Sequence, residues 1–153
     1  GQALDGKNLM PLLKENGTVA REAMFWHAPH YLAQPGNHFR VTPHSAVRKG
    51  DFKLIEFFHD HFEYDEPART AIRKAADDYA PYPLDGARYV PKAKIELFNI
   101  KKDIGEQNNL SAKMPGKVAE LKALLVHWRK SVGAQMPVKN PRFNPEFKKP
   151  RKK

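Results

Sequence analysis

Histidine is the residue type in this sequence best suited to chemistry near neutral pH, and six of the seven histidines lie within the first 61 residues. His27 and His30 flank an Ala-Pro pair at the end of an apolar, aromatic-rich stretch. Other rings and cations lie close to them in the sequence: Trp26, Tyr31, His38, His44, Arg48 and Lys49. A site for an anionic sugar needs rings that stack and cations that pair. The residues around His27 and His30 have this composition, but from their spacing alone a packed loop with ordinary hydrogen-bonded histidines is favoured over a binding site.

A second histidine pair, His59 and His61, would point to the same side if the strand before it continued. Three carboxylates lie nearby, on Glu56, Asp60 and Glu63. Imidazole and carboxylate suit zinc or nickel, so a metal site is conceivable. No third ligand occurs at a firm spacing, and hydrated surface histidines are the alternative. We assign no metal ligand.

Nucleophile patterns are missing from the sequence. The chain has no cysteine, which excludes disulfides, thiolate metal sites and cysteine nucleophiles. The only serines are Ser45, Ser111 and Ser131, and none lies in a Gly-x-Ser-x-Gly elbow. There is also no glycine-rich loop of the kind that cradles phosphate. We assign no catalytic residue to this chain.

The charge is strongly positive, with 27 Lys and Arg against 17 Asp and Glu, a net +10 and a pI near 9.8. Residues 137–153 form a proline-rich basic tail in which five of the last six residues are Lys or Arg. Its prolines favour extended backbone. The tail is either a solvated arm or an element that binds polyanions.

Hydrophobic patterning and turn residues predict an α+β fold. Expected strands cover 23–27 and 95–99, and a hairpin joins 45–48 to 52–58 through Gly50. Expected helices cover 8–14, 67–79 and 115–132, and we expect loops over 28–43 and 81–91. We further expect Gly105 to supply the unusual dihedral of a turn that Asp103 stabilises, and Gly133 to end the last helix.

The simplest packing is a small four-stranded antiparallel sheet against a long C-terminal amphipathic helix, whose apolar stripe steps by three and four residues from Val118 to Val132. The strands are apolar on both faces, so one helix leaves a face uncovered. The insertion at 59–94, a missing domain or a second copy of the chain would cover it. No apolar run reaches the ~18 residues of a membrane span, and no signal peptide is expected.

Several motifs occur in one order along the chain. They are Asp5-Gly-x-x-Leu9-x-Pro11-Leu-Leu13, Arg21-Glu-x-x-Phe25-Trp26-His27, Ala46-Val-Arg48-x-Gly50-Asp-x-Lys53-Leu54 and Glu96-Leu-Phe98-Asn99-x-x-x-Asp103-x-Gly105-Glu106-x-x-Asn109-Leu110. Together they resemble the C-terminal part of an arylsulfatase-type sulfatase. Phe-Trp-His-x-Pro-His-Tyr at 25–31 and Gly133-Ala-x-Met136-Pro137 are similar to bacterial members that act on sulfated polysaccharides.

The resemblance implies a C-terminal domain over residues 1–136, with the insertion at about 59–94, followed by the tail. It also implies a larger N-terminal catalytic domain as partner, which carries a formylglycine made from a Cys/Ser-x-Pro-x-Arg motif and a calcium ion. No serine here lies in that motif, so the resemblance places no cofactor in this chain. His27 and His30 would help to recognise a sulfated carbohydrate, and a periplasmic or extracellular location is implied.

Two other functions follow from the residues themselves. The charge and the tail favour a stand-alone basic module that binds a sulfated glycan or nucleic acid. An uncovered sheet face favours a homo-oligomer.

Overall fold

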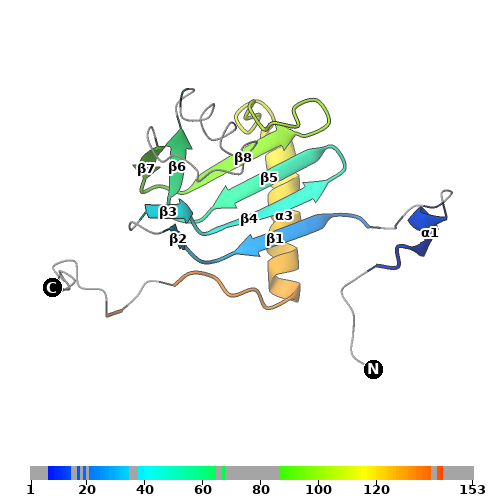
Figure 1. Cartoon of the computed structure of the whole chain (residues 1–153), viewed down its shortest axis with the longest axis horizontal. Helices are drawn as coiled ribbons and strands as arrows, with labels where there is room; N and C mark the ends of the chain where they lie inside the picture. The colour runs from blue at the N-terminus through cyan, green and yellow to red at the C-terminus, as the bar shows by residue number, and fades with distance from the viewer. Residues whose placement is uncertain are drawn as a thin grey trace.

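A computed structural model describes residues 7–14, 17, 19, 21–34, 38–64, 67, 87–138 and 141–142. Its centre is a four-stranded antiparallel sheet with the order β1-β4-β5-β8. The strands are β1 (Met24–Ala28), β4 (His44–Lys49), β5 (Phe52–Phe57) and β8 (Lys94–Asn99). Helix α3 (Pro115–Ser131) passes behind this sheet (Figure 1). The expected α+β architecture of a sheet and a C-terminal helix is confirmed.

Glycines with positive φ set two of the chain reversals. Gly50 has φ +57° in the two-residue turn between β4 and β5, and Gly133 has φ +61° after α3. The amide of Gly133 donates to the carbonyl of Lys130, and that of Ala134 donates to the carbonyl of Arg129. These two bonds are the Schellman pattern, which satisfies carbonyls that the helix end leaves without partners.

The core lies between the sheet and α3. Val47, Leu54, Leu97, Leu121 and Leu125 are at most 1% exposed and form one cluster. Of the expected helix stripe, Val118 and Trp128 pack against this cluster, whereas Val132 is 55% exposed and lies beyond the helix end. Trp128 stacks on Phe25 of β1, with ring centroids 4.7 Å apart and planes 3° from parallel.

Two pairs of short antiparallel strands lie at one end of the central sheet (Figure 1). Strand β2 (Leu32–Gln34) pairs with β3 (His38–Val41), and β6 (His61–Tyr64) pairs with β7 (Ala87–Val90). The expectation of loops over 28–43 and 81–91 is therefore wrong in part, because strands this short pair through their backbones without a long apolar pattern. Apart from Pro67, the helix expected at 67–79 lies outside the described residues.

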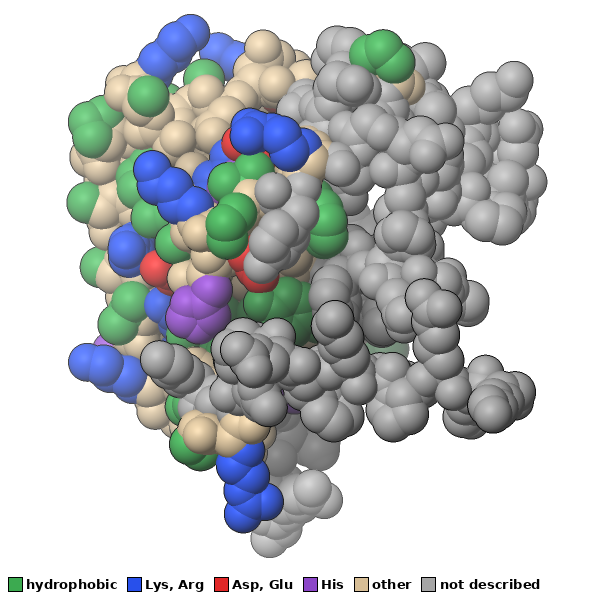
Figure 2. All heavy atoms as spheres, turned by 90° about the vertical axis from the view of Figure 1, so that its left-hand side faces the viewer, with side chains coloured by type: hydrophobic (Ala, Val, Ile, Leu, Met, Phe, Trp, Pro, Cys, Tyr) green, Lys and Arg blue, Asp and Glu red, His purple; other side chains and the backbone are tan. Residues whose placement is uncertain are grey.

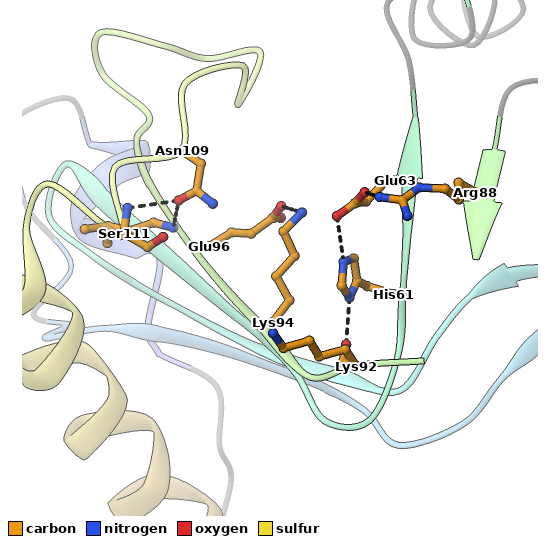
Figure 3. A network of polar contacts seen from close by, with 9 residues as sticks. His61, Glu63, Arg88, Lys92, Lys94, Glu96, Asn109 and Ser111 are labelled. Atoms are coloured by element: carbon orange, nitrogen blue, oxygen red, sulfur yellow. Dashed lines mark hydrogen bonds and ion pairs between the residues drawn. The ribbon is translucent and has the colours of Figure 1, made fainter. Parts of the chain in front are cut away.

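The loop from β8 to α3 closes against the outer edge of β8. The Asn109 side-chain oxygen accepts from the amides of Leu97 and Ser111, at 3.1 and 2.9 Å (Figure 3). The Leu97 carbonyl accepts from the amide of Leu110 at 2.7 Å. Asp103 accepts the amides of Gln107 and Asn108, as predicted for this turn. The positive φ, however, belongs to Glu106 at +53° and not to Gly105.

The short helix α1 (Met10–Leu13) stands apart from the sheet (Figure 1). It begins two residues later than expected, after the Asn8 side chain accepts the amide of Met10. None of its residues is buried, and four large apolar side chains in or beside it are at least half exposed: Leu9, Met10, Leu12 and Leu13. Among the described residues, no helix is long and apolar enough to cross a membrane.

Candidate functional site

Strand β1 sends its polar and aromatic side chains to two different faces, because neighbouring residues of a strand point in opposite directions. Trp26 is paired with Ala46 and lies on the face away from α3. His27 is paired with Ser45 and lies on the face toward α3. The group predicted from the sequence is therefore divided by the sheet: Trp26, His44 and Arg48 share one face, while His27 and Lys49 lie on the other.

Both ring nitrogens of His27 are engaged within the chain. Nδ1 lies 2.7 Å from the Ser45 hydroxyl, and Nε2 lies 2.6 Å from the Gln135 carbonyl. Because a carbonyl only accepts, Nε2 carries the proton, and in the neutral ring Nδ1 accepts from Ser45. His27 thus fastens the segment after α3 to the sheet. His30 is exposed beyond the end of β1. Substrate binding by His30 stays a prediction, and so does substrate binding by His27.

Lys49, a second member of this group, is also engaged on the helix face of the sheet. The Lys49 ammonium lies 2.8 Å from Glu22 and 4.0 Å from Glu120. The hydrogen bond that Lys49 donates to Glu22 raises the pKa of Lys49, and the same bond lowers the pKa of Glu22. Lys49 therefore joins the strand to its neighbours and does not point toward a ligand on the open face.

The second histidine pair is not brought together. His59 is exposed in the bend after β5, whereas His61 begins β6 and is 3% exposed. Its Nδ1 lies 2.7 Å from the Lys92 carbonyl and its Nε2 lies 3.2 Å from Glu63, which also pairs with Arg88 (Figure 3). The bond from His61, followed by that from Arg88, lowers the pKa of Glu63. The strand does not continue from His59 to His61, so the premise of the metal site fails.

Within the described part of the chain, no group of three or more His, Asp or Glu side chains is arranged to hold a metal ion.

The face of the sheet away from α3 carries an open depression of about 390 Å³. Trp26, His44, Arg48, Lys53 and Ile55 rise from the sheet, and the loop after β8 contributes an outer wall of Ile100, Ile104 and Glu106. No described helix or strand lies over the middle of this face (Figure 1). Trp26 is 46% exposed and Ile104 is 86% exposed.

Two cations and one carboxylate line this depression. Arg48 and Lys53 are directly opposite each other on β4 and β5. The Lys53 ammonium lies 2.7 Å from Glu106, and both side chains are partly buried. Arg48 is exposed, and its one hydrogen bond among the described residues is a long 3.4 Å contact from Nε to the Gly50 carbonyl. The depression therefore combines an aromatic surface with an available guanidinium group.

Cations also stand out at the end of the sheet that carries β2, β3, β6 and β7. Figure 2 shows Lys and Arg side chains projecting from the described part of this end, with a few Asp and Glu side chains between them. Such a surface attracts anionic partners in a salt-dependent way.

Sequence reasoning missed the contribution of Lys53, Ile104 and Glu106 to this face. Arg48 and Lys53 are each the second residue from the two-residue turn at Gly50, so counting outward from that turn along both strands would have paired them. The two loop residues gave no such signal, because their position depends on how the loop after β8 folds back. Comparison of the chain with protein-family models and with curated proteins found no match.

Proposed function

We propose that this chain is the C-terminal domain of a formylglycine-dependent sulfatase, where it completes the fold of the catalytic domain and shapes its substrate cleft. The observation that carries the proposal is the agreement between the ordered motifs and the architecture. The motif residues Phe25 and Leu54 pack in the core, Gly50 makes the hairpin turn, and Asp103 and Asn109 organise the loop before α3.

Surfaces left open in the described part of the chain support a large partner domain. Leu9, Met10, Leu12 and Leu13 expose between 50 and 73% of their area on and beside α1. An apolar patch of this kind is unusual on an isolated soluble domain and typical of an interface. The proposal assigns α1 to the contact with the catalytic domain, and assigns the end of the sheet near His30 to the mouth of the cleft.

Hydrolysis belongs to the partner in this proposal. The chain lacks cysteine, and no serine is followed by Pro and Arg at the required spacing, so its residues do not fit a formylglycine centre. Its chemical part is to hold a sulfated carbohydrate in place. The family resemblance also favours a periplasmic or extracellular location.

The test compares the isolated chain with the protein encoded by the complete reading frame. We expect a Cys/Ser-x-Pro-x-Arg motif upstream of this sequence. We also expect release of sulfate from p-nitrophenyl sulfate by the complete protein and none by the isolated chain. Turnover by the isolated chain, or an upstream frame without the motif, contradicts the proposal.

Introducing negative charge into the apolar surface of α1 tests the proposed contact separately. Leu12→Asp together with Leu13→Asp should leave thermal unfolding of the isolated chain unchanged, since both residues are more than half exposed. In the complete protein the same change should reduce folded yield and activity. Val138→Asp is the matched control, because Val138 is 86% exposed and lies outside α1. Equal effects of the two variants would remove α1 from the interface.

A further inference from the structure

We propose that the depression on the open face of the sheet binds the ring of an anionic sugar, with Trp26 as the stacking surface and Arg48 as the partner of its sulfate or carboxylate. Within the proposed sulfatase, this site would hold a glycan chain away from the bond that is cleaved. The binding site itself depends on the geometry of the sheet face and does not require the chain to be part of a sulfatase.

The pairing of strands makes this face electrostatically unusual. Arg48 and Lys53 occupy directly opposite positions on β4 and β5. Like charges directly opposite each other on neighbouring strands destabilise the pair of strands. Glu106 neutralises Lys53 at 2.7 Å, which leaves Arg48 as the cation without a carboxylate partner among the described residues. An anionic ligand would complete the charge balance of the site.

Arg48 is suited to such an anion. Its described hydrogen bond uses Nε, so both terminal amino groups remain available within the described structure. A guanidinium group presents paired donors that match the oxygens of a carboxylate or sulfate. Trp26 lies on the adjacent strand of the same face and is 46% exposed, so its ring can cover one side of a sugar. The volume of about 390 Å³ is within the ~300–1,000 Å³ range of ligand pockets.

Glu106 gives an independent indication of function at this position. It is the one non-glycine residue with positive φ in the described structure, at +53°. A side chain in this region costs roughly 1–2 kcal/mol, and such residues cluster at ligand sites. The unusual backbone lies in the loop wall of the depression, and the Glu106 carboxylate lies on Lys53. It sets the charge of the depression and holds Lys53 away from the ligand.

The experiment is a titration of the isolated chain in which tryptophan fluorescence is the readout. The ligands are galactose 6-sulfate, galacturonate, galactose and sodium sulfate. The chain has two tryptophans, and Trp128 is stacked on Phe25 on the other side of the sheet, so only Trp26 should respond. We expect both anionic sugars to bind more tightly than galactose or sulfate alone. Preference for one anionic sugar identifies whether sulfate or carboxylate is the natural group.

Three variants and a control locate the site. Arg48→Gln should weaken binding about tenfold, because it removes a charge-assisted pair. Trp26→Ala should weaken it about fivefold and abolish the fluorescence response; NMR chemical shifts then report binding. Glu106→Gln should tighten binding about twofold by removing a competing negative charge. Lys130→Gln removes the same charge as Arg48→Gln from the exposed last turn of α3 and should change binding less than about twofold.

Retention of the wild-type Tm by Arg48→Gln and Trp26→Ala shows that the fold is intact, as their exposure predicts. Equal weakening by Arg48→Gln and Lys130→Gln would overturn the proposal, because binding would then follow net charge only. Equal affinity for galactose and its sulfate would also overturn it, as would the absence of any response. A sulfatase assignment could survive each of these outcomes, because its test uses the complete protein.

Discussion

Glu56 joins β5 to α3 through two cations, and this cluster allows a quantitative test of the packing. Its carboxylate lies 2.7 Å from the Arg129 guanidinium and 3.3 Å from the Lys122 ammonium. The Glu56 and Arg129 side chains are 15% and 11% exposed, whereas Lys122 is 45% exposed. Arg129 also lies over the Phe58 ring at 5.4 Å, and its other terminal amino group is buried without a hydrogen bond to any described residue.

Removing the Glu56 charge should lower the free energy of unfolding more than removing the Arg129 charge. Breaking a buried pair from one side costs about 3–5 kcal/mol, and the remaining exposure here favours the lower limit. We therefore expect Glu56→Gln to lower the free energy of unfolding by about 3 kcal/mol, because among the described residues the Arg129 charge then keeps only the Phe58 ring as a partner. Arg129→Met should cost about half as much, on the order of 1.5 kcal/mol, since Glu56 keeps Lys122.

The double variant completes a thermodynamic cycle. Glu56→Gln with Arg129→Met leaves no unpaired buried charge, so its cost should be smaller than the sum of the single costs by about 1.5 kcal/mol or more. Urea unfolding at pH 7, followed by circular dichroism, measures all three values. Lys122→Gln is the control for an exposed partner and should cost less than about 0.5 kcal/mol.

Additive single costs, or single costs below about 0.5 kcal/mol, would refute this account, because the pair would then be screened by solvent.

Three further predictions concern the helix end, the loop and the tail. Gly133→Ala should lower the free energy of unfolding by about 1 kcal/mol, because the φ of Gly133 is +61°. Gly116→Ala in α3 should be neutral or stabilising by up to ~0.5 kcal/mol. If thermal unfolding ranks the two variants otherwise, Gly133 is not the residue that ends the helix. Amide hydrogen bonds from Gln107 and Asn108 lower the pKa of Asp103, so its stabilisation is present above the unfolded pKa of about 4 and is lost as pH falls through the lower folded value. Asp103→Asn should therefore flatten that acid dependence of Tm; an unchanged profile would remove Asp103 as its source. Deletion of 146–153 should weaken binding to heparin and reduce its salt dependence; an unchanged affinity shows that the tail is not the binding element.

The elements with a long or regular pattern were predictable from the sequence. Strand alternation and the turn at Gly50 located the central hairpin within one or two residues. The helix from Pro115 was found to within one residue, because Pro115 and Gly133 mark its limits. The short strands of the two outer strand pairs were missed, since three or four residues are too few to show a period.

The candidate site was predicted only in part, for a physical reason. Closeness in sequence grouped Trp26 with His27, but a strand sends such neighbours to opposite faces. The positive φ was assigned to Gly105 from residue type, whereas the loop places it at Glu106. Folding back of the loop after β8 and its ion pair with Lys53 are tertiary effects, which no local pattern in the chain encodes.

The way Asn109 and Leu110 cover the middle of β8 has a consequence for assembly. The outward backbone groups of Leu97 are already used by these two residues, so β8 resists the addition of another strand at its centre. Among the described strands, β1 has no partner on the outer side of the same sheet. Addition of a strand to this four-stranded sheet is therefore expected along β1 and not at the centre of β8.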